Sequence, residues 1–297
     1  MDDIVTNAHL CTHLPFVKNI PPAVRFMLLS TLSFALMNAL VKYLVHFPTF
    51  EIVFFRSLSS LLITTAILKT KKIPFKPNKR SLLIIRGIMG VTSMSLFFMS
   101  AHYISIGSAV TIRYIAPLFT ALMAILFLKE KIFSLQWLFF IVAFIGVILI
   151  KGFDESVSVL GFSLAVGAAF TSAIVYIIIS KIGYQDHPIL IVHYFMGIAT
   201  IVGALGMTFS WVQPSLIELS MLLFLGVLGY FGQIFMTKAF QSDEASKVAP
   251  IKYVEVLFTL SFGVYWFGEV YTILSLAGIF LVIFGLSANI IYKNKKT

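Results

Sequence analysis

Ionisable side chains inside long apolar stretches are the residues of this sequence with the clearest chemical potential. Placing a charge at the centre of a bilayer costs about 2.5–3.5 kcal/mol even on insertion scales. Each such side chain therefore needs a partner of opposite charge or a water-filled cavity, which makes it a candidate ligand-binding group. Five charged residues and, more weakly, two histidines fit this description: Lys42, Arg56, Arg113, Lys252, Glu255, His102 and His193.

Glu255 is the acidic residue of this set, and Lys252 precedes it by three positions. That spacing puts both side chains on the same face of a helix, where they can form an ion pair. In a second interpretation, Glu255 receives the cationic group of a substrate. Both interpretations stay open together, because the carboxylate could exchange one partner for the other.

The cationic residues suggest groups that bind an anion. The planar fork of Arg56 could hold a carboxylate or a phosphate, or it could tie helix ends together. Arg113-Tyr114 matches Lys252-Tyr253 in residue class, and tyrosine rings attract both cations and planar ligands. We expect Arg86, near the start of its apolar stretch, to snorkel toward the membrane surface. The predicted substrate-binding residues are Glu255, Lys252, Tyr253, Arg113, Tyr114 and Arg56.

Motifs of catalytic, cofactor or metal sites are not apparent in the sequence. It has no Gly-rich phosphate loop, no His-Glu-x-x-His and no nucleophile elbow. The single cysteine, Cys11, cannot build an intramolecular disulfide or a cysteine metal cluster. Glu130 and Glu269 lie at the ends of apolar stretches, and we expect them to terminate those stretches. The sequence therefore predicts no enzyme, no cofactor and no metal.

The elements that carry these residues are membrane-spanning helices. The chain is 59% hydrophobic and only 11% charged, against about 25% charged residues in soluble proteins. A helix that crosses a bilayer needs about 20 apolar residues. Ten stretches satisfy this requirement, at 23–46, 49–69, 81–102, 107–128, 135–151, 158–181, 188–209, 215–238, 245–267 and 271–291.

The basic residues of the connections predict the orientation, because Lys and Arg favour cytoplasmic loops. If the N-terminus is cytoplasmic, the outer loops carry only Lys151. The net charge of +10 thus reflects topology, with a lipid bilayer as partner and no nucleic acid. We predict an N-in/C-in protein of the cell inner (plasma) membrane with a cytoplasmic tail at 1–22 and an uncleaved first span. Sixteen basic residues would then be cytoplasmic: Lys18, Arg25, Lys69, Lys71, Lys72, Lys76, Lys79, Arg80, Lys129, Lys131, Lys181, Lys238, Lys247, Lys293, Lys295 and Lys296.

The two halves of the chain resemble each other at an offset of 139 residues. Residues 113–120 (RYIAPLFT) align with 252–259 (KYVEVLFT), and Gly87 aligns with Gly226. Five helices are an odd number, so the second copy must enter the membrane from the opposite face. The fold class is therefore an all-α membrane protein of ten transmembrane helices in two inverted five-helix repeats, at 23–151 and 158–292.

Glycines and prolines mark special positions in four of the stretches. The glycine stripes at 87–90 and 226–232 favour close helix packing, between their two stretches or with neighbours, over contact with a ligand. Pro117 and Pro250 should each bend a helix, since proline lacks the backbone donor. Such a bend could serve as a gate or as a static kink.

Three segments carry a resemblance to a known family: residues 50–56 (FEIVFFR), 85–87 (IRG) and 249–256 (APIKYVEV). With them, essentially the whole chain resembles the EamA-type ten-helix branch of the drug/metabolite transporter superfamily, and within it the S-adenosylmethionine uptake transporters. The resemblance implies a central cavity between the repeats and alternating access. It also implies that the fifth and tenth spans are peripheral, where they could form a homodimer.

The predicted function is secondary transport of a small polar, zwitterionic metabolite. S-adenosylmethionine uptake or exchange would fit, with cationic groups at Glu255 and a carboxylate at Arg56, Arg113 or Lys252. Proton coupling would use Glu255 or His193. Export of amino acids or drugs is the alternative within transport. A membrane-embedded enzyme or a sensor is less favoured, because clustered His, Asp or Glu and an appended soluble domain are missing from the sequence.

Overall fold

The computed structural model describes residues 20–104, 106–151, 158–267 and 273–296. Most of the predicted N-terminal tail, with Cys11 and Lys18, lies outside these residues, as does Glu269. The secondary structure of the described residues consists of helices without strands, and the helical segments coincide with all ten predicted stretches to within a few residues. The all-α prediction is therefore confirmed for this part of the chain.

Six of the described helices are long and apolar enough to cross a membrane. They are α1 (Pro22–Leu44), α2 (Thr49–Thr70), α3 (Arg80–Ser100), α7 (Val159–Ile182), which continues into the 3-10 turn η4 (Gly183–Gln185), α8 (Pro188–Met207) and α9 (Leu216–Ser242). The helices α6 (Ser134–Lys151) and α12 (Ile273–Lys296) contain shorter apolar segments, Ser134–Leu149 and Ala277–Asn289.

The two remaining predicted spans are interrupted helices. One consists of α4 (Ile106–Arg113), α5 (Ala116–Met123) and the π-helix η3 (Ala124–Leu128). The other consists of α10 (Ala245–Val248), the 3-10 segment η5 (Ala249–Tyr253) and α11 (Val254–Phe267). Pro117 and Pro250 each sit beside an interruption, as expected for residues that cannot donate to the preceding turn. The irregular backbone exposes Arg113 and Lys252 to the middle of the bundle.

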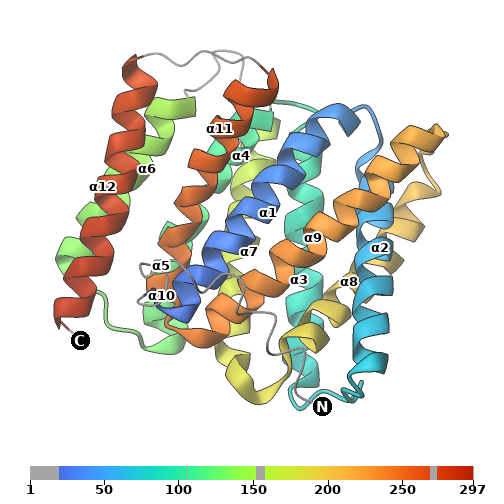
Figure 1. Cartoon of the computed structure of the whole chain (residues 1–297), viewed down its shortest axis with the longest axis horizontal. Coiled ribbons are helices and arrows are strands. Elements are labelled where there is room, and N and C mark those ends of the chain that lie inside the picture. The colour runs from blue at the N-terminus through green and yellow to red at the C-terminus, as the bar shows by residue number, and fades with distance from the viewer. Residues whose placement is uncertain (1–19, 105, 152–157, 268–272, 297) are drawn as a thin grey trace, which may run out of the picture.

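The long helices pack in pairs that join the two halves of the chain (Figure 1). The main pairs are α1 with α9, α3 with α7, and α2 with α8. The helices α6 and α12 pack on each other at one edge of the bundle (Figure 1), where Gln136 donates a buried 2.9 Å hydrogen bond to Asn289. The bundle core thus lies between helices of different halves.

The glycine stripes lie where helices approach closely, but their contacts are with neighbouring helices rather than with each other. A Cβ on Gly90 would meet the Phe195 ring of α8 at 2.8 Å, and one on Gly232 would meet the Phe34 ring of α1 at 2.7 Å. A Cβ on Gly229 would lie 2.8 Å from Nε of Arg56. The stripe on α9 therefore also makes room for a buried guanidinium.

Gly203 of α8 provides a test of this packing. A Cβ there would lie 2.7 and 2.8 Å from the backbone N and Cα of Phe54, whereas a Cβ on Gly197 of the same helix would meet only Leu61 Cδ1, at 3.9 Å. We expect Gly203→Ala to cost about 1–3 kcal/mol through overpacking and Gly197→Ala to be nearly neutral. Thermal unfolding of the purified variants in detergent measures the difference, and equal melting temperatures would contradict this account.

Candidate functional site

A cavity of about 70 Å³ lies in the middle of the bundle. Ligand pockets usually measure about 300–1,000 Å³, so this conformation has room for a few water molecules but not for a metabolite. Both halves of the chain contribute to its wall. The lining residues are Phe34, Met37, Arg56, Arg86, Gly90, Ser93, Met94, Phe97, Phe98, Arg113, Ser172, Val175, Tyr176, Phe195, Gln233, Met236 and Lys252.

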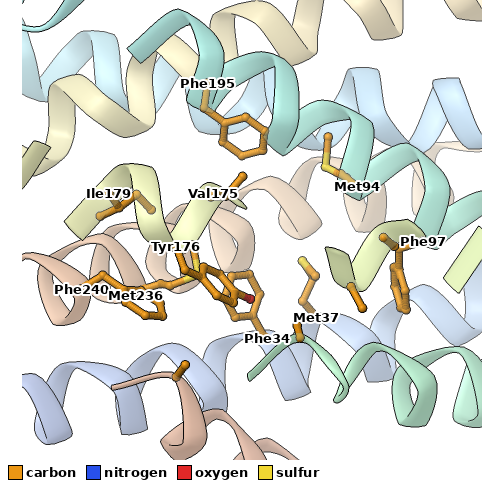
Figure 2. Packing of buried hydrophobic residues seen from close by; sticks show 14 of the residues in the cluster. Phe34, Met37, Met94, Phe97, Val175, Tyr176, Ile179, Phe195, Met236 and Phe240 are labelled. Carbon is orange, nitrogen blue, oxygen red and sulfur yellow. The ribbon is translucent and has the colours of Figure 1, made fainter. Parts of the chain in front are cut away.

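Apolar side chains make up much of this wall. Figure 2 shows Phe195 and Met94 on one side, with Tyr176, Phe34 and Met37 opposite them. Aromatic rings that surround cations stabilise them through their electron-rich faces. The wall can therefore hold positive charge without bringing it into contact with lipid.

Glu255, in the first turn of α11, is completely buried beside the cavity. Its Oε1 accepts a 2.9 Å hydrogen bond from Asn38 Nδ2 and lies 3.5 Å from Arg113 Nη2. Its Oε2 lies 3.5 Å from Lys252 Nζ. The predicted pairing of Glu255 with Lys252 is thus present, and Arg113 joins it. Both carboxylate oxygens already have cationic partners.

Arg113 and Lys252 also lie over aromatic rings. The Arg113 guanidinium is 4.2 Å from the centroid of Phe97, and the Lys252 ammonium is 4.9 Å from that of Phe34. Their neighbours Tyr114 and Tyr253 pack against each other, with ring centroids 6.0 Å apart. Neither tyrosine lines the cavity in this conformation.

Arg56 lies in the cavity wall, as its position in α2 suggested. It is 4% exposed, and its Nη1 contacts the sulfur of Met94. Its guanidinium carbon is 6.0 Å from the centre of the Phe98 ring. These neighbours are uncharged, so none of them neutralises the guanidinium.

The expectation that Arg86 snorkels to the membrane surface is wrong. This residue is completely buried and lines the cavity, with Nη2 donating a 2.7 Å hydrogen bond to Gln233 Oε1. Its guanidinium carbon lies 4.1 Å from the centroid of Phe195. Arg86 is six residues, about 9 Å, inside α3, and the face it occupies packs against α8. The side chain therefore points into the bundle.

Three other ionisable candidates lie away from the cavity. Lys42 is exposed in the last turn of α1. His102 is exposed and bonds Thr49 Oγ1 at 3.1 Å. His193 is half-buried, and its Nδ1 lies 3.1 Å from Thr64 Oγ1. These contacts suffice to explain the positions of the two histidines.

Sequence reasoning missed Asn38 and Gln233, each of which bonds a charged residue of the site. Their signal was present, since each is an amide side chain inside a predicted span. Buried amides need hydrogen-bond partners, and a buried charge is the strongest such partner.

Glu130 connects two interrupted helices at one end of the bundle. Its carboxylate accepts backbone hydrogen bonds from Ala245, at 2.8 Å, and Ser246, at 3.0 Å. These amides open α10, so Glu130 holds the end of η3 to the beginning of the other interrupted helix. It terminates its own span, as expected, and fixes the position of another.

Replacement of Glu255 tests the buried charge cluster. We expect Glu255→Gln to cost about 3 kcal/mol, because Arg113 and Lys252 would lose their carboxylate partner in a buried site. Adding Lys252→Met should recover part of that loss by removing one unpaired cation. Unfolding in a denaturing detergent measures both effects. A single variant as stable as the wild type would contradict the account.

The EamA-like transporter family model matches residues 21–152 and 159–291. A pseudopaline exporter of Pseudomonas aeruginosa is 31% identical over 86% of this chain and 91% of its own length. Human solute carrier family 35 member G1 is 30% identical over 87% of this chain and 76% of its own.

An S-adenosylmethionine uptake transporter of Rickettsia conorii is 28% identical over 94% of this chain and 96% of its own. A crystal structure with 13% sequence identity superposes with a TM-score of 0.79, covers 92% of this chain and 98% of its own, and supports the fold alone. The chain belongs to the EamA-like transporter family of the drug/metabolite transporter superfamily, and it is a multi-pass membrane transporter rather than an enzyme.

Proposed function

We propose that the protein is a secondary transporter that moves a small polar, zwitterionic metabolite by alternating access through the central cavity. The observation that carries this proposal is the charged cavity itself. It lies between helices of both halves and is too small for a metabolite. A substrate could enter only if the halves moved apart on one side, and leave only if they moved apart on the other.

The two halves act in this proposal as inverted repeats, 23–151 and 158–292. Positions related by the offset of 139 meet around the cavity, where Phe97 corresponds to Met236 and Arg113 to Lys252. The helix pairs also correspond under the repeat relation. Helix α1 corresponds to α7 and α9 corresponds to α3, so the contact of α1 with α9 corresponds to the contact of α7 with α3. Repeat-related contacts of this kind support rocking of one half against the other.

The contact between α6 and α12 is also symmetric under the repeat relation. A Cβ on Gly146 would meet the backbone oxygen of Gly278 at 2.7 Å, and one on Gly285 would meet that of Phe139 at 2.8 Å. Residues 139 and 278 are themselves one offset apart. We place the proposed homodimer interface on this pair of helices, because they lie at one edge of the bundle.

The proposed orientation is N-in/C-in in the inner membrane. The excess of basic residues in alternate connections supports it. In Figure 1, α1 begins and α12 ends toward the same end of the bundle. The connection at 129–133 is one of the connections predicted to be cytoplasmic. The hydrogen bond from Ala245 to Glu130 would therefore lie on the cytoplasmic side.

A stacked aromatic pair would form the cytoplasmic gate. The ring centroids of Tyr176 and Phe240 are 4.6 Å apart, and the rings are inclined by 14°. Tyr176 lines the central cavity, and Phe240 lines an open space of about 740 Å³ that also borders Glu130. The pair therefore separates the two spaces, and its opening would connect them.

The relatives leave the direction and the substrate open, since one is named as an exporter and another as an uptake transporter. S-adenosylmethionine uptake or exchange remains one candidate form of the function. Export of amino acids or drugs is the second. The described residues place Glu255 against Arg113 and Lys252, so a cationic substrate group would have to displace one of them.

The gate can be tested by labelling a cysteine in the cavity wall. In a Cys11→Ser, Ser172→Cys background, we expect Phe240→Ala to raise the rate of labelling by a water-soluble thiol reagent several-fold from the cytoplasmic side. The reason is that only the Tyr176 ring of the stacked pair would remain between the cytoplasmic side and the cavity. Phe231→Ala, on the exposed face of α9, is the matched control. Unchanged labelling in Phe240→Ala would exclude this gate.

Transport itself is tested by counterflow in proteoliposomes. Labelled S-adenosylmethionine is offered to vesicles preloaded with S-adenosylhomocysteine, and labelled glutamate or alanine to vesicles preloaded with the same amino acid. We expect at least one probe to accumulate, and Glu255→Gln, still folded, to reduce that accumulation at least tenfold. Absence of counterflow for every polar probe would count against the proposed function.

A further inference from the structure

The cavity wall carries more positive than negative charge. Four cationic side chains line it: Arg56, Arg86, Arg113 and Lys252. Among the described residues, Glu255 is the acidic residue that contacts any of these four through an ion pair. Formal charges therefore leave an excess of three positive charges around a space of about 70 Å³.

Glu255 cannot neutralise the two arginines of α2 and α3. Its oxygens are already engaged by Arg113, Lys252 and Asn38. Glu51, the other buried glutamate, occupies the first turn of α2, accepts a hydrogen bond from the backbone of Val212, and does not line the cavity. Arg56 and Arg86 are thus left with uncharged partners.

Both guanidinium groups have unused donors. In the described residues, Nε of Arg56 and both Nε and Nη1 of Arg86 are buried without a hydrogen-bond partner. Their remaining contacts are the sulfur of Met94, the amide oxygen of Gln233 and the ring of Phe195. Buried donors normally find partners, and a buried cation without a counter-charge is strongly unfavourable.

An anion inside the cavity would satisfy these donors. A guanidinium binds carboxylate and phosphate oxygens through charge-assisted hydrogen bonds, often two at a time. We propose that the transported substrate is a net-anionic metabolite with at least two oxyanion groups, carboxylate or phosphate, which Arg56 and Arg86 bind. This inference rests on the proposed transport function and specifies its substrate class.

The two arginines belong to one half of the chain, whereas Arg113 and Lys252 are repeat-related. Position 225, one offset from Arg86, is a leucine, so α9 offers no matching cation. The anionic groups should therefore lie toward α2 and α3. An ammonium on the same substrate is tolerated if the oxyanions outnumber it. S-adenosylmethionine has one carboxylate and two cationic groups, so it would add positive charge to a cavity that already has an excess.

The test is thermal unfolding of the purified protein at low ionic strength with citrate, succinate, fructose 1,6-bisphosphate, alanine or S-adenosylmethionine. Sodium chloride at matched ionic strength controls for screening. We expect one or more of the three anions to raise the melting temperature in a saturable manner, and alanine and S-adenosylmethionine to leave it unchanged. A response to citrate or succinate indicates recognition of carboxylates, and a response to fructose 1,6-bisphosphate indicates recognition of phosphates.

Substitutions of the two arginines test whether they bind the stabilising anion. Arg56→Gln and Arg86→Gln should each weaken the binding of the stabilising anion at least tenfold. Neither should lower the melting temperature without ligand, because each removes an unpaired buried charge. Arg86→Lys, which keeps the charge but loses the fork, should bind with intermediate affinity. Arg80→Gln is the matched control, since Arg80 is exposed at the beginning of α3.

Stabilisation by S-adenosylmethionine or alanine, with none by the three anions, would overturn the inference, and so would anion binding that survives in both glutamine variants. Counterflow of the same probes separates this result from the transport function. Anion binding without counterflow would leave the anion site standing and remove the transport proposal. Counterflow of S-adenosylmethionine without anion binding would do the reverse.

Discussion

The ionic contacts of Glu255 are the constraint on which the centre of this bundle depends. One buried carboxylate joins Asn38 of α1, Arg113 at the end of α4 and Lys252 of η5. A buried carboxylate is stable only with partners of this kind. The cluster therefore ties three helical segments from both halves of the chain to a single point.

The breaks in the two interrupted helices make this cluster possible. In an unbroken helix, the side chains of Arg113 and the residues after it would point outward at regular angles around the helix axis. Every backbone group would also be hydrogen-bonded within the helix. The breaks beside Pro117 and Pro250 instead place Arg113 and Lys252 next to irregular backbone in the bundle interior. Irregular backbone at membrane depth is tolerated where protein buries it or where it lines a cavity.

The side chains around the cavity explain how this conformation can hold several cations. Phe97, Phe34 and Phe195 each present a ring to one of them, and Gln233 supplies an amide oxygen to Arg86. These contacts reduce the cost of burial, but they do not cancel charge. A cavity held in this state is suited to a ligand that supplies the missing negative charge and is released when the site opens.

The sequence by itself determined the helices and the charged residues to consider. Apolar length predicts the spans, prolines predict the breaks, and the spacing of Lys252 and Glu255 predicts their ion pair. Only the tertiary structure decided which faces point inward. In a stretch that is apolar all round, lipid-facing and core-facing positions have the same residue types, so periodicity does not distinguish them. Arg86 therefore looked like a surface residue and lies in the cavity wall, whereas Tyr114 and Tyr253, which are predicted to bind substrate, pack against each other outside the lining of the cavity in this conformation.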